Sequence, residues 1–394
     1  MTQNKRRSVS IDAYRAVVML LMIFVNDTWT LIDIPTWIGH LPAEQDGVGL
    51  ADVVFPAFLF IVGLSVPFAI QSRIRKGDTK WAIVQHIILR AAALIVMGLF
   101  HVNLEYYPDN ALLSKSVWQI LITVGFFLVW LNYSDQNSKR TWLLKVSGIV
   151  LLMILVLLFK DKTAPFGTVV MQVYWWGILG IIGWSYLLVS IVFLVTKGKW
   201  WIQIVVFITF VLFNMGAQSA LFDSWSEVRN YIWIIGDGAM PALAICGVCL
   251  SLLYRKWKDT DRMRFVYYGL FIGLALLLLG QWFREFWIIS KIWATPSFTL
   301  ICAGISTLGF VFVTYITDIR KWTSWYGWIQ PAGTSTLTCY LLPYIHYALL
   351  GFVAYRLPEW MRTGELGMLK SLIYAWIIIV IAGWLERRRL NLKL

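Results

Sequence analysis

Apolar residues gather into runs of roughly 20 along this chain, and short polar connectors separate the runs. A helix rises about 1.5 Å per residue, so each run is long enough to cross a hydrocarbon layer of about 30 Å. Backbone groups in lipid must be satisfied within their own segment, so these runs predict α-helices. About twelve spans are expected, near residues 12–32, 50–72, 81–101, 112–131, 141–159, 174–195, 200–219, 238–254, 264–283, 297–317, 327–354 and 368–385.

The composition supports this interpretation. Of the 394 residues, 59% are hydrophobic and only 14% are charged, and the mean hydropathy is +0.69. Soluble domains carry about a quarter charged residues. We therefore expect an all-α polytopic transmembrane helical bundle of about 12 spans (10–12), formed by residues 1–394 as a single domain.

Basic residues concentrate in every second connector, for example at 73–80, 255–264 and 387–393. By the positive-inside rule both termini are then cytoplasmic, and the connector that contains His40 lies on the opposite side. The net charge of +13 thus reflects topology and predicts no nucleic-acid partner. We expect a multi-pass membrane protein whose main partner is the lipid bilayer, and the sequence leaves a homodimer open.

The stretch GHLPAEQDGVGLADVVFPAFLFIVG, residues 39–63, places polar groups directly against an apolar run. It contains His40 and the three carboxylates Glu44, Asp46 and Asp52. Asp52 stands at the edge of the run, where an unpaired charge costs several kcal/mol of desolvation. This placement favours a functional site, and the alternative is a polar loop that precedes a helix.

Three polar residues in the first span share one side of the predicted helix. Arg15 and Asn26 are eleven residues apart, so they differ by only about 20° around the axis. Asp12 lies near the same face, which gives an acid–base pair at the inner end and an amide roughly 16 Å further out. Asp12 and Arg15 are equally compatible with a simple i,i+3 pair, whereas the deeper Asn26 favours a function.

The third span contains His86, Arg90 and His101, with Arg90 about halfway along. An arginine at that depth needs a carboxylate, carbonyls, water or an anionic ligand. A structural pair with Asp52 or another acid is at least as plausible an account as ligand binding. Asp237, which opens the eighth span, is a weaker candidate.

Several kinds of chemistry lack a sequence signature. The chain has no phosphate-binding glycine loop, no GxSxG and no HExxH motif. Cys246 and Cys249 form a CxxC without a second His or Cys pair, so we interpret them as packing residues and expect no metal. The remaining pattern suits the movement of a molecule, or the transfer of a group, across the membrane.

Several segments together resemble one family. They are RRSVSIDAYRAVVMLLMIFVN, then His40, then GVGLADVVFPAFLFIVGLS, ILRAAALIVMGL and WATPSFTLICAGIS. This order is similar to the heparan-α-glucosaminide N-acetyltransferase family, including its bacterial relatives. The likeness is strongest over 8–101 and weaker over 290–345, and an additional helix pair is expected around 112–160.

The resemblance implies a membrane enzyme that takes acetyl from cytosolic acetyl-CoA and delivers it to a glucosamine-type amine on the far side. The family's bacterial relatives imply a location in the bacterial cytoplasmic (inner) membrane. His40, Asn26, Asp52, Arg15 and Arg90 fall on positions of the family's motifs. Combined with the polar residues above, the predicted site consists of catalytic His40, Asn26 and Asp52, cofactor-binding Arg15, Arg90 and Asp12, and substrate-binding Glu44, Asp46 and Asp237.

Elementary chemistry suggests a role for each group. An imidazole acts either as general base toward an amine or as an acyl-accepting nucleophile, and Asp52 or Asp46 fixes its tautomer. Asn26 donates to the thioester carbonyl as negative charge develops. The arginines hold the coenzyme phosphates, so we expect a cavity that joins His40 to the basic inner end.

Two other hypotheses stay open. Twelve spans, helix prolines and buried Arg and His are equally natural in a transporter for amino sugars or other small sugars. A scaffold or inactive relative is the third interpretation.

Overall fold

The computed structural model describes residues 9–160, 171–219, 236–353 and 357–394. Within these ranges the regular structure is helical, apart from two isolated bridges between single residues. The α-helices are α1 (Val9–Asp27), α2 (Leu50–Arg75), α3 (Lys80–Glu105), α4 (Lys115–Trp130), α5 (Lys139–Leu158), α6 (Ile178–Val195), α7 (Trp200–Gln218), α9 (Ala239–Trp257), α10 (Arg262–Phe283), α11 (Pro296–Thr314), α12 (Gln330–Thr334), α13 (Thr336–Val353) and α14 (Gly364–Arg387).

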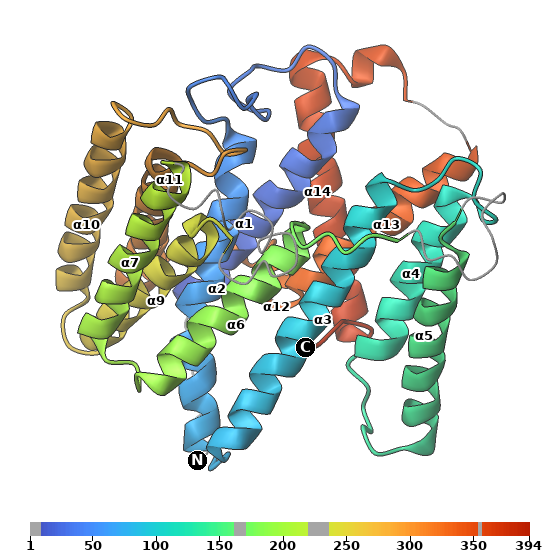
Figure 1. Cartoon of the computed structure of the whole chain (residues 1–394), viewed down its shortest axis with the longest axis horizontal. Coiled ribbons are helices and arrows are strands. Elements are labelled where there is room, and N and C mark those ends of the chain that lie inside the picture. The colour runs from blue at the N-terminus through green and yellow to red at the C-terminus, as the bar shows by residue number, and fades with distance from the viewer. Residues whose placement is uncertain (1–8, 161–170, 220–235, 354–356) are drawn as a thin grey trace.

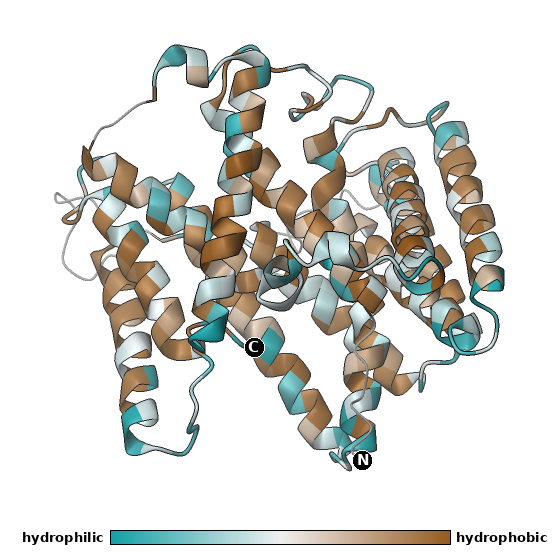
Figure 2. Ribbon diagram, turned by 180° about the vertical axis from the view of Figure 1, so that it is seen from behind, coloured by the Kyte–Doolittle hydropathy of each residue, from teal (hydrophilic) through white to brown (hydrophobic). Residues whose placement is uncertain are grey.

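Eleven helices in the described part of the chain are long and apolar enough to cross a membrane, and α4 is shorter. Each of the twelve predicted spans falls on one helix, except that the eleventh divides into α12 and α13. Figure 2 shows apolar helix middles with polar residues near many helix ends. The prediction of an all-α polytopic membrane protein is confirmed.

Short polar side chains define where several helices begin. The hydroxyl groups of Thr79, Ser114 and Thr295 accept hydrogen bonds from backbone N–H groups in the first turns of α3, α4 and α11. These bonds satisfy donors that have no partner inside the helix. The helix boundaries therefore follow from local chemistry as well as from hydropathy.

The helices α1, α2, α9 and α11 are the most buried spans and form the centre of the bundle (Figure 1). Around them α10 packs along α11 and α3 along α6, whereas α4 and α5 form a hairpin at one edge. Two glycines bring α2 and α9 into backbone contact. A side chain at Gly63 would overlap the Ala244 carbonyl group, and one at Gly247 would overlap the Phe60 carbonyl group.

The two ends of the bundle differ in what they carry. The connector 28–49 lies at one end, which we call the His40 end (Figure 1). The N-terminal end of α1 and the connectors 76–79, 131–138, 196–199 and 258–261 lie at the other, which we call the basic end.

Enlarging either glycine between α2 and α9 should destabilise the bundle. We expect Gly63→Leu and Gly247→Val each to cost about 1–3 kcal/mol, because the added atoms collide with backbone that cannot move aside easily. Thermal unfolding in detergent micelles measures this as a lower melting temperature. Leu278→Val is the control, since Leu278 is 72% exposed on the surface of α10, and equal melting of all variants would contradict the prediction.

Candidate functional site

The connector that carries His40 folds back over the first turn of α2. The Leu50 and Ala51 N–H groups donate to the Trp37 and Ile38 carbonyl groups at 2.7 and 3.1 Å. Gly49 approaches the backbone of Gly39 so closely that a side chain at 49 would overlap its carbonyl oxygen. The connector therefore has a fixed path beside the helix N-terminus.

A second connector, between α10 and α11, is bound to the first through Asp46. Asp46 accepts hydrogen bonds from the Ile289 N–H at 2.8 Å and from the Arg284 guanidinium at 2.7 Å. The Ser290 hydroxyl group donates to the Ala43 carbonyl at 2.8 Å. Partial burial acts to raise the pKa of Asp46, but the Ile289 N–H and the Arg284 charge outweigh it and lower that pKa.

Asp52 lies where the two connectors meet the start of α2, and it is only 1% exposed. One of its oxygens, Oδ2, accepts from the backbone N–H groups of Leu41 and Gly49 at 3.2 and 3.0 Å. The other, Oδ1, lies 2.7 Å from His40 Nδ1 and 3.5 Å from Lys291 Nζ. Asp52 is thus both a cap of α2 and the carboxylate that orients the imidazole.

A cavity of about 710 Å³ opens beside this group at the His40 end of the bundle. The imidazole of His40 is 55% exposed at its margin. Polar and aromatic side chains line it at several points, namely Asn26, His40, Gln218, Asp237, Lys291, Trp176 and Trp293. Sugar-sized ligands fit a space of this size.

The predicted site residues at this end separate into two groups. His40, Asn26 and Asp237 line the cavity, and Asp52 contacts His40 from behind. Glu44 is exposed and, like Asp46, does not line the cavity. Of the two carboxylates proposed to fix the His40 tautomer, Asp52 makes the contact, whereas Asp46 joins the two connectors.

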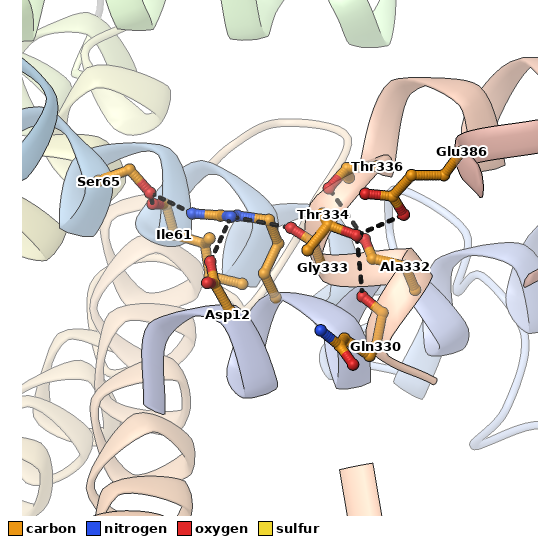
Figure 3. A network of polar contacts seen from close by, with 10 residues as sticks. Asp12, Ile61, Ser65, Gln330, Ala332, Gly333, Thr334, Thr336 and Glu386 are labelled. Carbon is orange, nitrogen blue, oxygen red and sulfur yellow. Dashed lines mark hydrogen bonds and ion pairs between the residues drawn. The ribbon is translucent and has the colours of Figure 1, made fainter. Parts of the chain in front are cut away.

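Asp12 and Arg15 lie toward the basic end of α1. The guanidinium of Arg15 donates to Asp12 at 3.0 Å, to the Gly333 carbonyl at 2.9 Å and to the Ser65 hydroxyl at 2.7 Å. Figure 3 shows Asp12, Ser65 and Gly333 around this guanidinium, with Thr334 and Glu386 beside them. The i,i+3 pair is present, and it also joins α1 to α2 and α12.

Arg90 lies over the ring of Tyr186 at 5.0 Å and forms no ion pair with any described carboxylate. The expected alternative pairing with Asp52 is therefore wrong for the residues that the structure describes. Its buried Nε atom also has no hydrogen-bond partner among them.

Among the described residues, the lining of this cavity does not extend to the predicted basic group at the other end. The residues that line the cavity reach Met22 on α1 and Phe55 on α2, and they include neither Arg15 nor Arg90. Met22 and Arg15 are seven residues apart, roughly 10 Å along a helix.

Sequence reasoning missed Lys291, Trp176 and Trp293. Lys291 precedes the segment WATPSFTLICAGIS, whose resemblance to the family was the available signal. The reasoning also missed Asp27, which is 2% exposed and accepts hydrogen bonds at 2.6 Å from each of three side chains on α13 and α14, namely Tyr347, Lys370 and Ser371.

The fold and this site define a polytopic membrane protein with a carboxylate-oriented histidine at one end of a helical bundle. Residues 7–235, more than half of the chain, match the family described as a domain of unknown function (DUF5009), and the chain belongs to that family.

The chain is also similar to two mammalian enzymes. A stretch of 101 residues is 33% identical to the heparan-alpha-glucosaminide N-acetyltransferase of Homo sapiens, covering 25% of this chain and 14% of the human protein. The Mus musculus enzyme of the same name is 32% identical over 107 residues, 26% of this chain and 15% of the mouse protein. The similarity thus spans about one seventh of each relative's length.

Neutralising Asp46 should loosen the connector that carries Lys291. In Asp46→Asn the amide still accepts from Ile289 but loses the charge that holds Arg284, so amide hydrogen exchange across 284–291 should quicken. In the wild type the link is present at neutral pH and is lost as the pH falls through the lowered pKa of Asp46, because protonation removes the charge. Glu44→Gln is the matched control, and equal exchange in both variants would exclude the link.

Proposed function

We propose that this chain is a transmembrane acetyltransferase that moves an acetyl group from cytosolic acetyl-CoA to the amine of a glucosamine-type sugar on the other side of the membrane. The observation that carries the proposal is the contact between His40 and Asp52 at the margin of a cavity. Similarity to the mammalian N-acetyltransferases supplies the reaction class.

His40 would perform the proton transfer. Its Nδ1 faces Asp52 at 2.7 Å, which leaves Nε2 for the reactants. The acceptor amine attacks the thioester carbonyl while Nε2 takes the amine proton, and the departing thiolate then takes that proton to become the free thiol. Asn26 is exposed to the cavity and would donate to the developing oxyanion.

The acceptor sugar would occupy the wider part of the cavity. Asp237 supplies the carboxylate that lines it, and its side chain also accepts from the Ala239 N–H at 3.1 Å at the start of α9. Trp176 and Trp293 also line this space, and the face of an indole ring attracts a cationic amine. Glu44 and Asp46 do not line this space, so Asp237 is our preferred residue for acceptor binding.

The donor would enter from the basic end, which the positive-inside rule assigns to the cytoplasm of a bacterial cell. Arg90 suits a phosphate ligand, because its buried Nε atom has no partner in the described chain. Arg15 and Asp12 lie at the same end of α1, where their pair would order the entrance. The thioester would reach His40 when α1 and α2 separate below Met22.

One observation favours a second function. The cavity lies at the His40 end, and its lining on α1 extends inward as far as Met22, which is also the arrangement expected of a sugar transporter in one of its states. Such a protein would move an amino sugar without consuming acetyl-CoA.

The enzyme hypothesis predicts the effect of removing the imidazole or the amide. Purified protein in nanodiscs, given labelled acetyl-CoA and a panel of amino sugars, should release thiol and form N-acetyl product. His40→Ala should lower the rate by about 10²–10⁴-fold, and Asn26→Ala by roughly 10²-fold. His86→Gln is the control, because His86 lies near the basic end of α3 and outside the cavity.

The same protein in liposomes separates the two functions. Acetyl transfer that depends on His40 supports the enzyme. Uptake of labelled amino sugar without acetyl-CoA, together with no product in the transfer assay, would overturn it in favour of the transporter.

Arg90 should govern affinity for the donor. We expect Arg90→Gln to raise the KM for acetyl-CoA by about tenfold, the effect of losing one charge-assisted contact, with little change in kcat. Arg140→Gln, at the start of the peripheral helix α5, is the matched control. An unchanged KM in Arg90→Gln would remove Arg90 from the donor site.

A further inference from the structure

Lys291 stands at the predicted catalytic group, although sequence reasoning did not select it. It belongs to the connector between α10 and α11, and its side chain is 27% exposed. Its Nζ lies 3.0 Å from His40 Nδ1 and 3.5 Å from Asp52 Oδ1. The same imidazole nitrogen is 2.7 Å from Asp52 Oδ1.

This geometry restricts where the protons lie. A neutral imidazole carries one proton, on either Nδ1 or Nε2. If Nδ1 is protonated, it donates to Asp52. A charged Lys291 ammonium 3.0 Å away would then direct a second donor at the same nitrogen, which is unfavourable. If Nδ1 is unprotonated, it and Asp52 Oδ1 are both acceptors, and the ammonium, 3.0 Å from one and 3.5 Å from the other, donates between them while Nε2 carries the proton.

We propose that Lys291 selects the tautomer of His40. When Lys291 is charged, Nδ1 accepts from it and Nε2–H has no lone pair for the reactants. When Lys291 is neutral, Nδ1–H donates to Asp52 and Nε2 is available as a base. Lys291 is therefore a positioning residue, and its role in turnover depends on the proposed acetyl transfer.

The proton count closes within the site. As the amine attacks and Nε2 takes its proton, His40 becomes an imidazolium whose Nδ1–H still donates to Asp52, and Lys291 stays neutral. When the thiolate leaves, it takes the Nε2 proton, and His40 is neutral again. The carbon–sulfur bond breaks, the carbon–nitrogen bond forms, and no other reactant is needed.

The groups around Lys291 change the pKa of its amine. Burial lowers the pKa of Lys291 from its usual value, and the nearby Asp52 carboxylate opposes this effect. The other titratable groups around it are the buried Cys302 thiol of α11 and Asp237 in the same cavity. The lowered pKa makes the neutral amine of Lys291 accessible at a lower pH than that of an ordinary lysine.

Imidazole ¹⁵N NMR tests the proposal without any activity. The chain has four histidines, so histidine-labelled protein gives few signals, and His40→Gln identifies the one from His40. In the wild type we expect the Nε2–H tautomer at neutral pH and conversion to Nδ1–H as Lys291 loses its proton. Lys291→Met should show Nδ1–H throughout the same range, and Lys291→Arg should show Nε2–H, because arginine stays charged.

Kinetics give a second readout that distinguishes this role from plain charge stabilisation. Lys291→Arg should lower kcat/KM by about 10²-fold or more at every pH, the scale of a lost general base. Lys291→Met should retain activity and lose the rise with pH that the wild type shows. A cation that stabilised an oxyanion would give the opposite ranking, with the arginine variant active and the methionine variant impaired.

Each outcome decides one proposal. A His40 tautomer that is the same in wild type, Lys291→Met and Lys291→Arg across the lysine titration overturns the role of Lys291. If thermal unfolding shows that either variant does not fold, the wild-type titration still decides the question. A His40 tautomer that stays the same while Lys291 loses its proton overturns the role of Lys291. Tautomer switching without acetyl transfer in the wild type supports Lys291 while overturning the acetyltransferase.

Discussion

The buried carboxylate of Asp52 is the constraint on which the His40 end of this protein depends. A buried anion is tolerable only when its oxygens have partners, and here two backbone N–H groups, an imidazole and an ammonium surround it. Those partners come from the connector before α2 and from the connector before α11. Satisfying a single charge therefore brings together segments that are 251 residues apart, and it positions His40 at the cavity.

Hydropathy predicted the spans well because lipid leaves few alternatives to a long apolar helix. Helical phase and the position of Asp52 also drew attention to His40 and Asn26, which do line one cavity. Lys291 escaped prediction because its importance arises from a contact between connectors, which no periodicity encodes. Arg90 was selected as a site residue, but its neighbour was not predicted for a similar reason, since that neighbour is the ring of Tyr186 rather than a carboxylate.

The polar groups of the bundle divide according to what they stabilise. Asp46 and Arg284 hold two connectors together, and Arg15 joins three helices near the basic end. The cavity lies apart from both groups, with apolar walls around a few polar side chains. This division explains why Asp46, which the sequence placed among the substrate-binding residues, does not line the cavity beside His40.

The carboxylate of Asp27 has a mechanical consequence. Its three short hydrogen bonds to α13 and α14 fasten α1 close to its last turn. The other half of that helix is also anchored, by the Arg15 guanidinium and by the hydroxyl groups of Ser10 and Tyr14, which bond to Asp318 and to the Ser306 carbonyl group. With both of its halves tethered to other helices, α1 resembles a fixed post. Any separation between α1 and α2 would therefore have to break the contact between Arg15 and Ser65, and α2 would have to supply most of the movement.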